Sequence, residues 1–554
     1  MSAVAERTRS ERRESASSGG PLTGTGRLLR FMLRRDRVRV PVWVLAVSIM
    51  AAYFSNVIAL VMDEEALNAM TAFAANPIMG LIGGPGFGFD AITVPRFVVG
   101  MYGTSLMLGA AFMSITTISR HTRVEEQTGR AELIRANVVG RHAPLAAALV
   151  VAALMNIVMA LLTGLTMMSS AAEPAPAGSL LFGAGLGAAG LAFAGVAAVT
   201  VQLSPFSRAA SGFAGLVLGV SFVVRGLGDM SAVQNGDLAW LSWLSPLGWP
   251  QQTAPFTNDD WWPLLLGVAL FALLVALAFA LQSRRDLAAG ILPDRLGRAA
   301  APGWLRGPLS LAYRLQRPSI AGWSIAMLLG GVTFGAFTRP MADGAEGMPE
   351  QIVGIMGGAD GIVEGYVGFM GVYFAMMVAA FAIISVQSLR AEEQGVRTEA
   401  VLATGVGRSA WLLSWTLVTA IGSLWLLALA GVGEGIGAAA GMNDWSMFWP
   451  VAFGHAAQVP AVWLLLGLSV GLYGVSPRIL GLAWAVFIVG ALLSLFGDML
   501  DLDDVVLSAS PFRHVGEYPA ENVSWAGIAV LTGIGAVCAA LGAIVFRRRD
   551  LTTA

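Results

Sequence analysis

Long apolar runs separated by short polar segments dominate this chain. Twelve runs reach the roughly 20 residues that a helix needs to cross a hydrocarbon layer about 30 Å thick. They start near Val40, Phe97, Pro144, Ser179, Ala209, Trp262, Ile320, Ile362, Ala410, Met447, Ile479 and Trp525. The pattern predicts an all-α membrane protein with twelve transmembrane helices. The fourth run is rich in glycine, which would permit a tilt or a break.

The composition supports this interpretation and narrows the chemistry. Hydrophobic residues make up 56% of the chain and charged residues 12%, whereas about 25% of residues are charged in soluble domains. The chain contains no Lys, and a Walker A loop needs one to reach the terminal phosphates of a nucleotide. We therefore expect this chain to bind no nucleotide cofactor itself. The four His residues show no metal-ligand spacing, and the net charge of −1 gives no reason to expect a nucleic-acid partner.

The distribution of arginine predicts the orientation. With both termini in the cytosol, only four of the 34 basic residues fall on the outside, which fits the positive-inside rule: Arg96, Arg225, Arg339 and Arg513. The sequence therefore predicts a multi-pass protein of the inner (plasma) membrane. Residues 1–25, rich in Arg and Ser, are predicted to form a disordered cytosolic tail.

A charged segment is written twice. Residues 123–141 (RVEEQTGRAELIRANVVGR, the first repeated segment) return without a gap at 390–408 (RAEEQGVRTEAVLATGVGR, the second repeated segment). The identical pairs are Arg123/Arg390, Glu125/Glu392, Glu126/Glu393, Gln127/Gln394, Arg130/Arg397, Glu132/Glu399, Ala136/Ala403, Val139/Val406, Gly140/Gly407 and Arg141/Arg408. The predicted topology puts both copies in the cytosol, after the second and eighth spans. We expect the paired glutamates to open a short helix and the glycine to permit a tight exit.

The repeat extends beyond these segments. Matching residues precede the first and seventh spans and follow the sixth and twelfth: Arg34/Arg314, Arg37/Arg317, Trp43/Trp323 and Arg284-Arg285-Asp286-Leu287/Arg548-Arg549-Asp550-Leu551. Six spans return the chain to the same side, so the two halves have parallel topology. We predict a first six-helix half with an amphipathic N-terminal helix at 26–282, a cytosolic linker with a second interfacial helix at 283–318, and a second six-helix half at 319–554.

The order of these elements resembles the type-2 ABC exporter permease. An Arg-rich amphipathic helix, six spans, an E-E-x-x-x-R-x-E segment after the second span and a Trp- and Pro-rich outer segment after the fifth carry the resemblance. The double-length form resembles the actinobacterial exporter of polyketide antibiotics family, of the tetronasin-resistance type. The chain departs from this family pattern in its long outer segment at 63–95, with the Gly-rich tract GGPGFGF, which is larger than a minimal permease of this type would need.

The resemblance implies a transport subunit, not an enzyme, that works with two copies of a separate ABC ATPase. ATP and Mg would be bound by that partner. The expected substrates are lipophilic drugs, antibiotics or other amphipathic molecules, and the Arg-rich helices would contact membrane lipid. The ATPase-coupling residues would be Glu125, Glu126, Arg130, Glu132, Gly140, Arg141, Glu392, Glu393, Arg397, Glu399, Gly407 and Arg408. The alternative is an interfacial connector whose charges are only solvated.

Other motifs favour different classes. A G-x-x-x-D-R-x-G-R motif at 290–298 fits major-facilitator antiporters, which carry it between spans two and three instead of in a central linker. The sequence Gly226-Leu-Gly228-Asp229 fits intramembrane aspartyl proteases, which need a second Asp to share a proton. We expect Asp229 and its counterpart Asp498 to lie at outer helix ends, as parts of a gate.

Polar residues inside the spans are candidates for the substrate pathway, since a charged group there costs about 2.5 to 3.5 kcal/mol on insertion scales. The candidates are Asn156, His455 and Gln458, with Met107 and Met376 as adaptable apolar neighbours. The alternatives are hydrogen bonds between helices for the polar residues and core packing for the methionines. Glu434 is expected nearer the outer interface.

Overall fold

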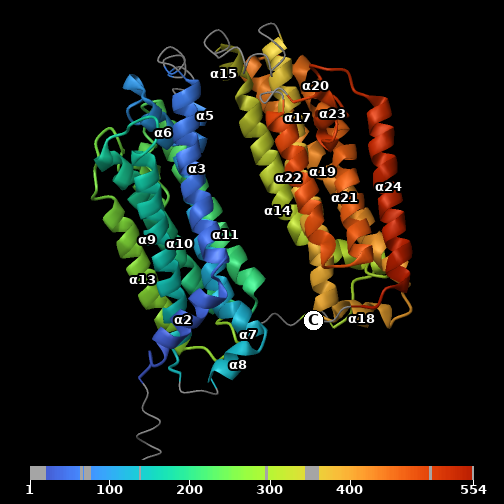
Figure 1. Cartoon of the computed structure of the whole chain (residues 1–554), viewed down its shortest axis with the longest axis horizontal. Helices are drawn as coiled ribbons and strands as arrows, with labels where there is room; N and C mark the ends of the chain where they lie inside the picture. Colours follow the sequence, from blue (N-terminus) through green and yellow to red (C-terminus); the bar gives the residue numbers. More distant parts are fainter. Residues whose placement is uncertain are drawn as a thin grey trace, which may run out of the picture. The chain divides into compact units, whose positions relative to one another are not determined.

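Two compact units make up the chain, Met1–Gly297 (unit 1) and Arg298–Ala554 (unit 2). The computed structural model describes residues 20–62, 67, 71, 77–135, 139–292, 297, 299–343, 361–497 and 502–551, and all regular secondary structure in those ranges is helical. Unit 1 runs from blue to green and unit 2 from yellow-green to red in Figure 1. The division falls within the predicted linker at 283–318.

Unit 1 places its short helices at two opposite ends. Within it, α2, α7 and α8 lie at one end and α5 at the other (Figure 1). Its elements are α2 (Thr25–Arg35), α3 (Arg39–Val61), α5 (Pro77–Ile82), η1 (Phe89–Ala91), α6 (Val94–Ser119), the π-helix η2 (Arg120–Val124), α7 (Glu125–Gln127), α8 (Arg130–Arg135), α9 (Ala143–Met168), α10 (Pro176–Leu203), α11 (Ser207–Val233), η3 (Ala239–Leu244), α12 (Gly248–Gln251) and α13 (Leu264–Ser283).

Unit 2 has α18 at one end and α15, α20 and α23 towards the other (Figure 1). Its elements are α14 (Pro308–Ala336), α15 (Thr338–Asp343), α17 (Ile362–Gln394), α18 (Arg397–Leu402), α19 (Arg408–Met442), η6 (Trp445–Met447), α20 (Phe448–Ala457), α21 (Val459–Val475), η7 (Ile479–Gly481), α22 (Leu482–Phe496), α23 (Asp504–Leu507), η8 (Pro511–Arg513) and α24 (Trp525–Arg548).

Most of the predicted spans are confirmed as long apolar helices. Among the described residues, 11 helices are long and apolar enough to cross a membrane, and each corresponds to one predicted run. The apolar helix at the remaining run, Ile479–Leu495, is shorter. The multi-pass membrane architecture is thus established, while twelve crossings and two equivalent six-helix repeats stay predictions.

The core of unit 1 is built around α10, the glycine-rich fourth run. This helix is continuous over Pro176–Leu203, and 83% of its most apolar window is buried, against 17% for α13. An added Cβ at Gly183 would collide with the main-chain oxygen of Ala160, and one at Gly190 would collide with the side chain of Asn156. The glycines therefore let α9 approach α10 closely, as small residues do between membrane helices.

In the core of unit 2, glycines likewise let α14 and α19 approach each other closely. A Cβ at Gly331 would collide with the oxygen of Ala430, and one at Gly433 would lie 2.5 Å from the oxygen of Leu328. The helix α14 crosses the predicted boundary at 318, because it runs unbroken from Pro308 to Ala336 with Pro318 inside it. Neighbouring helices and local adjustments make such a proline tolerable in a membrane helix.

We predict that Gly331→Ala destabilises unit 2 by about 1 to 3 kcal/mol, since the added methyl group forces α14 away from α19. Gly322→Ala in the same helix is the matched control, because a Cβ there meets nothing within 4 Å. Thermal unfolding of the detergent-purified protein measures the difference. Equal unfolding temperatures for the two variants would contradict the close helix contact.

Candidate functional site

The two repeated segments begin at the ends of long helices. Glu125 and Glu126 open the short helix α7, which continues the π-helix η2 without a break, and Glu392 and Glu393 lie in the last turn of α17. The expectation that the paired glutamates open a short helix therefore holds in unit 1 but is wrong in unit 2, where they end a long helix. No helix breaker precedes them, and the first residue with a left-handed backbone comes later, at Gly129 (φ 71°).

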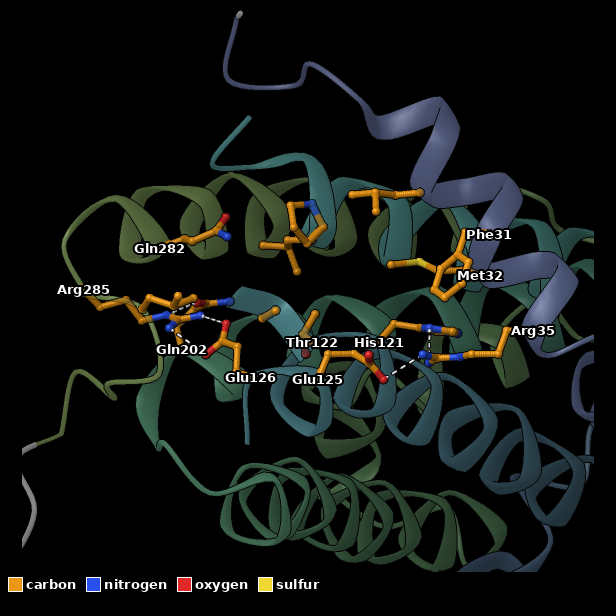
Figure 2. Close-up of a pocket in the computed structure, with 15 residues that line it drawn as sticks. Phe31, Met32, Arg35, His121, Thr122, Glu125, Glu126, Gln202, Gln282 and Arg285 are labelled. Carbon is orange, nitrogen blue, oxygen red and sulfur yellow. Dashed lines mark hydrogen bonds and ion pairs between the residues drawn. The ribbon is translucent and has the colours of Figure 1, made fainter. Parts of the chain in front are cut away.

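In unit 1 the second glutamate of the pair is held inside its own unit. Glu126 accepts hydrogen bonds from Arg123 at 2.7 Å and from Arg285 at 2.8 and 3.1 Å. The Nε of Arg285 donates to Gln202 at 2.6 Å. Figure 2 shows Glu126 and Gln202 next to Arg285 at one side of a cavity. This contact fixes the end of α7 to the chain that follows α13; we call Glu126–Arg285 the first brace.

Unit 2 repeats this contact with the equivalent residues. Glu393, whose side chain is 1% exposed, accepts a hydrogen bond from Arg549 at 2.7 Å and another from the hydroxyl of Tyr473. Arg549 occupies the place of Arg285 in the repeated Arg-Arg-Asp-Leu sequence. We call Glu393–Arg549 the second brace. The glutamate of the repeated segment and the arginine of the repeated Arg-Arg-Asp-Leu sequence thus contact each other within each unit.

The arginines that end the repeated segments reinforce the braces. Arg141 donates to the main-chain oxygens of Gln282 and Arg285, both at 2.8 Å. Arg408 likewise donates to the main-chain oxygen of Arg549. In both units, therefore, the loop after the second helix of the half is tied at its two ends to the residues that follow the last helix.

Unit 1 has an additional set of ion pairs at α2. Arg35 donates to Glu125 at 2.8 Å, and Arg120 donates to Asp36 at 3.0 Å through both Nε and Nη2. His121 lies 3.2 Å from Asp36. Burial raises the pKa of Asp36, but the hydrogen bonds from Arg120 and the charges of His121, Arg120 and Arg35 outweigh burial and hold it below its ordinary value of 3.8.

The residues before α2 contact the far end of the same loop. The main-chain amides of Gly140 and His142 donate to the oxygens of Thr23 and Pro21, both at 2.9 Å. A Cβ at Gly140 would collide with Pro21, whereas Gly407 has nothing within 4 Å. Gly140 is thus needed for this close approach. The end of the segment expected to be a disordered tail is instead bonded to the loop.

We call residues 20–36 the strap, since they connect the two ends of the first repeated segment. A narrow cavity of about 40 Å³ separates α2 from this segment, enough for a few water molecules. Figure 2 shows Phe31 and Met32 on α2 facing His121 and Thr122 across it. The cavity is too small for a drug-sized ligand.

The later polar residues of both repeated segments face outward. Arg130 and Glu132 on α8, and Glu399 on α18, are exposed. Arg397 on α18 is 60% exposed and donates to Glu392 at 2.6 and 2.9 Å, which raises the pKa of its guanidinium. The predicted coupling residues therefore separate into residues that hold the loop through contacts within the unit and exposed residues on α8 and α18 that a partner could reach.

The substrate-pathway candidates are buried within their own units. Asn156 donates to Ser114 at 2.8 Å and packs on α10, and Gln458 donates to the oxygen of Gly516 at 2.7 Å. Met107 and Met376 are 2% and 5% exposed. None of these residues lines the cavity beside α2. Their contacts match the alternative of helix packing, and a role in transport stays a prediction.

Sequence reasoning missed the partner of His455. Its Nε2 lies 2.8 Å from the carboxylate of Glu434, and both side chains are buried. His455 belongs to α20, and its ring also packs on Phe374 of α17. This buried pair joins α19 to α20. The two residues were both noted as polar positions within spans, but nothing local in the sequence pairs them.

The predicted outer gate residue Asp229 is part of a buried network. Its carboxylate pairs with Arg225 at 2.8 Å and accepts a hydrogen bond from Ser242 at 2.5 Å. Arg225 also donates to the main-chain oxygen of Leu81, in the Gly-rich outer segment. A carboxylate paired with Arg does not resemble a protease dyad that shares a proton. Asp498 and most of the facilitator-like motif lie outside the described residues.

The comparisons with known proteins now decide the family. A family model described as the C-terminal domain of the multidrug efflux system permease Rv1217c matches residues 27–281 and 305–547. The multidrug efflux system permease protein Rv1217c of Mycobacterium tuberculosis is 36% identical over 561 residues, which cover 99% of both chains. This chain belongs to that family of multidrug efflux permeases. One matched stretch lies in each unit of the permease.

The contacts of the permease that sequence reasoning did not find all join residues far apart along the chain. Arg285, Arg549 and Tyr473 lie far along the chain from the glutamates they contact. A signal for the first two did exist, because Arg-Arg-Asp-Leu occurs twice at equivalent places. No comparable signal marks Asp36 or Arg120.

We predict that Glu126→Gln and Arg285→Gln each destabilise the permease by about 3 kcal/mol, since each leaves a largely buried charge without its main partner. The double variant should lose less than the sum, because both changes break one contact. Thermal unfolding in detergent measures the cycle, with the exposed Glu132→Gln as control. Strictly additive losses would show that the brace carries no coupling.

The strap should respond to acid through Asp36. Its folded-state pKa is lowered, so its contribution to stability is present above the ordinary value of 3.8 and is lost as the pH falls below it. Hydrogen exchange of α2, corrected for intrinsic rates, should become faster as the pH falls below about 4. Asp36→Asn should remove this pH dependence; the same dependence in that variant would refute the assignment.

Proposed function

We propose that the permease is the membrane subunit of an ATP-driven ABC exporter. Two copies of a separate ATPase, which bind ATP and Mg, would dock on the two repeated segments. The observation that carries this proposal is the division of each segment into a buried brace and an exposed helix. The same division occurs in both units, at equivalent residues.

The braces would transmit a movement of the exposed helices to the rest of each unit. Glu126 and Glu393 tie each loop to the residues after α13 and α24, so a displacement of α8 or α18 is carried to several helices of that unit. An ATPase can shift this equilibrium only by the difference of its affinities for the two conformations. Exposed charged residues on a braced loop suit such a docking surface, since they can bind without unfolding the loop.

The transported compounds would be lipophilic drugs, antibiotics or similar amphipathic molecules. Support comes from the name of the relative, a multidrug efflux permease, and from the 11 apolar helices. We infer an orientation in the inner membrane with both termini cytosolic, which puts α2, α8 and α18 on the side where ATP is available. Under this orientation the chain crosses the membrane twelve times, in two parallel halves.

Replacing Arg130, Glu132, Arg397 and Glu399 together by Ala should weaken ATPase binding at least about tenfold, because several interface contacts of about 1 kcal/mol each are lost. Drug-stimulated ATP hydrolysis and export should fall with it. Binding and hydrolysis are measured in lipid nanodiscs with the purified ATPase, and export in vesicles. The unfolding temperature should not change, since these side chains lie outside the braces.

The matched control carries Asp237→Ala and Glu364→Ala, which remove exposed charges at the opposite ends of the units. Retained ATPase binding in the quadruple variant would contradict the docking surface. Export driven by a pH gradient alone, without nucleotide, would instead support a proton-coupled antiporter and refute the ATP-driven mechanism.

A further inference from the structure

The strap exists in unit 1 but not in the same form in unit 2. In unit 1, α2 is a separate helix, and Arg35 at its end pairs with Glu125. In unit 2 the corresponding residues belong to the continuous helix α14, and Glu392, the equivalent of Glu125, pairs with the nearby Arg397. The first repeated segment therefore has a second anchor, which comes from a helix at the membrane surface.

The side of α2 that faces away from this anchor is strongly basic. Arg30 and Arg34 are exposed and lie one turn apart on α2, and the exposed Arg37 follows in the turn after the helix. Together with Gly26, Leu29 and Leu33 they line a shallow open hollow. Within the residues that the structure describes, no acidic side chain pairs with these three arginines.

Charge and position identify what would bind this face. The helix directly precedes α3, the first apolar span, so the three arginines lie where that span ends. The apolar side chains of Leu29 and Leu33 lie between them, which suits a ligand with a charged head and an apolar body. Arginine near an anionic membrane surface attracts its phosphate groups, and the guanidinium fork binds phosphate with two hydrogen bonds.

We propose that this face is a binding site for the headgroup of an anionic phospholipid, and that a bound lipid holds the strap on the first repeated segment. Arg34 and Arg37 flank Arg35 and Asp36, the two residues that pair with Glu125 and Arg120. A phosphate that neutralises the flanking arginines removes their mutual repulsion and fixes α2 at the membrane surface. The ion pairs Arg35–Glu125 and Asp36–Arg120 between the strap and the first repeated segment are then formed in a larger fraction of the molecules.

The consequence is an asymmetric transporter. The loop of unit 1 would be stiffened by anionic lipid, whereas the loop of unit 2 would not respond to it. A change in transport rate with lipid charge rests on the proposed function, but lipid binding and its effect on the strap do not. The two claims can therefore fail separately.

The first experiment measures binding of the lipid itself. The full permease is placed in nanodiscs of phosphatidylcholine with spin-labelled phosphatidylglycerol as the probe. Arg30→Gln, Arg34→Gln and Arg37→Gln together should weaken its retention at least about tenfold. The control variant Arg208→Gln/Arg478→Gln/Arg548→Gln removes the same charge from other exposed positions and should retain the probe. Equal losses in both variants would show a non-specific basic surface and overturn the site.

The second experiment follows hydrogen exchange at residues 25–35 and 120–127. Adding phosphatidylglycerol to phosphatidylcholine nanodiscs should slow exchange in both peptides of the native permease and in neither peptide of the α2 triple variant. The double variant Arg35→Gln/Asp36→Asn, which removes both contacts of the strap with the loop, should keep the binding of the probe but lose the protection at 120–127. Protection at 120–127 that persists in this double variant would refute transmission through the strap.

Folding of every variant is checked first by its unfolding temperature. If the triple variant does not fold, Arg34→Gln alone replaces it, since a single exposed arginine has no part in the packing of α2. Unchanged exchange in the native permease on addition of phosphatidylglycerol would overturn the proposal whatever the variants show. No ATPase is present in either experiment, so the result does not depend on the proposed partner.

Discussion

In each unit, the end that carries the repeated segment depends on one largely buried carboxylate paired with one distant arginine. The pairs Glu126–Arg285 and Glu393–Arg549 connect the loop that contains the repeated segment to the residues that follow α13 or α24. Removing one partner of such a pair costs about 3 to 5 kcal/mol, because the other charge stays buried. The pairs therefore define a single arrangement of the helix ends.

This constraint explains why a polar sequence occurs twice in an otherwise apolar chain. The buried glutamate and the arginine that ends each segment hold the loop, and the residues between them form a short exposed helix. The two loops nevertheless differ. Only the first is also held by Arg35 and Asp36 of the strap, so the units share a mechanism for bracing but not the same stiffness.

Much of the fold could be predicted from the sequence, because span length and hydropathy are local properties. The predicted starts near Val40, Pro144 and Ala410 lie within two residues of the observed helix starts, Arg39, Ala143 and Arg408. The site was only partly predictable. Which charges are buried depends on which helices pack against each other, and the sequence around a residue does not indicate its neighbours from distant parts of the chain. The sequence did not indicate that α14 continues through Pro318, which occupies an exposed position inside the helix.

The central claim is that the repeated segments are braced from within and dock their partner through α8 and α18. A cryo-EM structure of the permease bound to its ATPase subunits tests it most directly. We predict two interfaces, one that contains Arg130 and Glu132 and another that contains Arg397 and Glu399, with both Glu–Arg braces still formed. An interface in which Glu126 or Glu393 leaves its arginine to contact the ATPase would contradict this account.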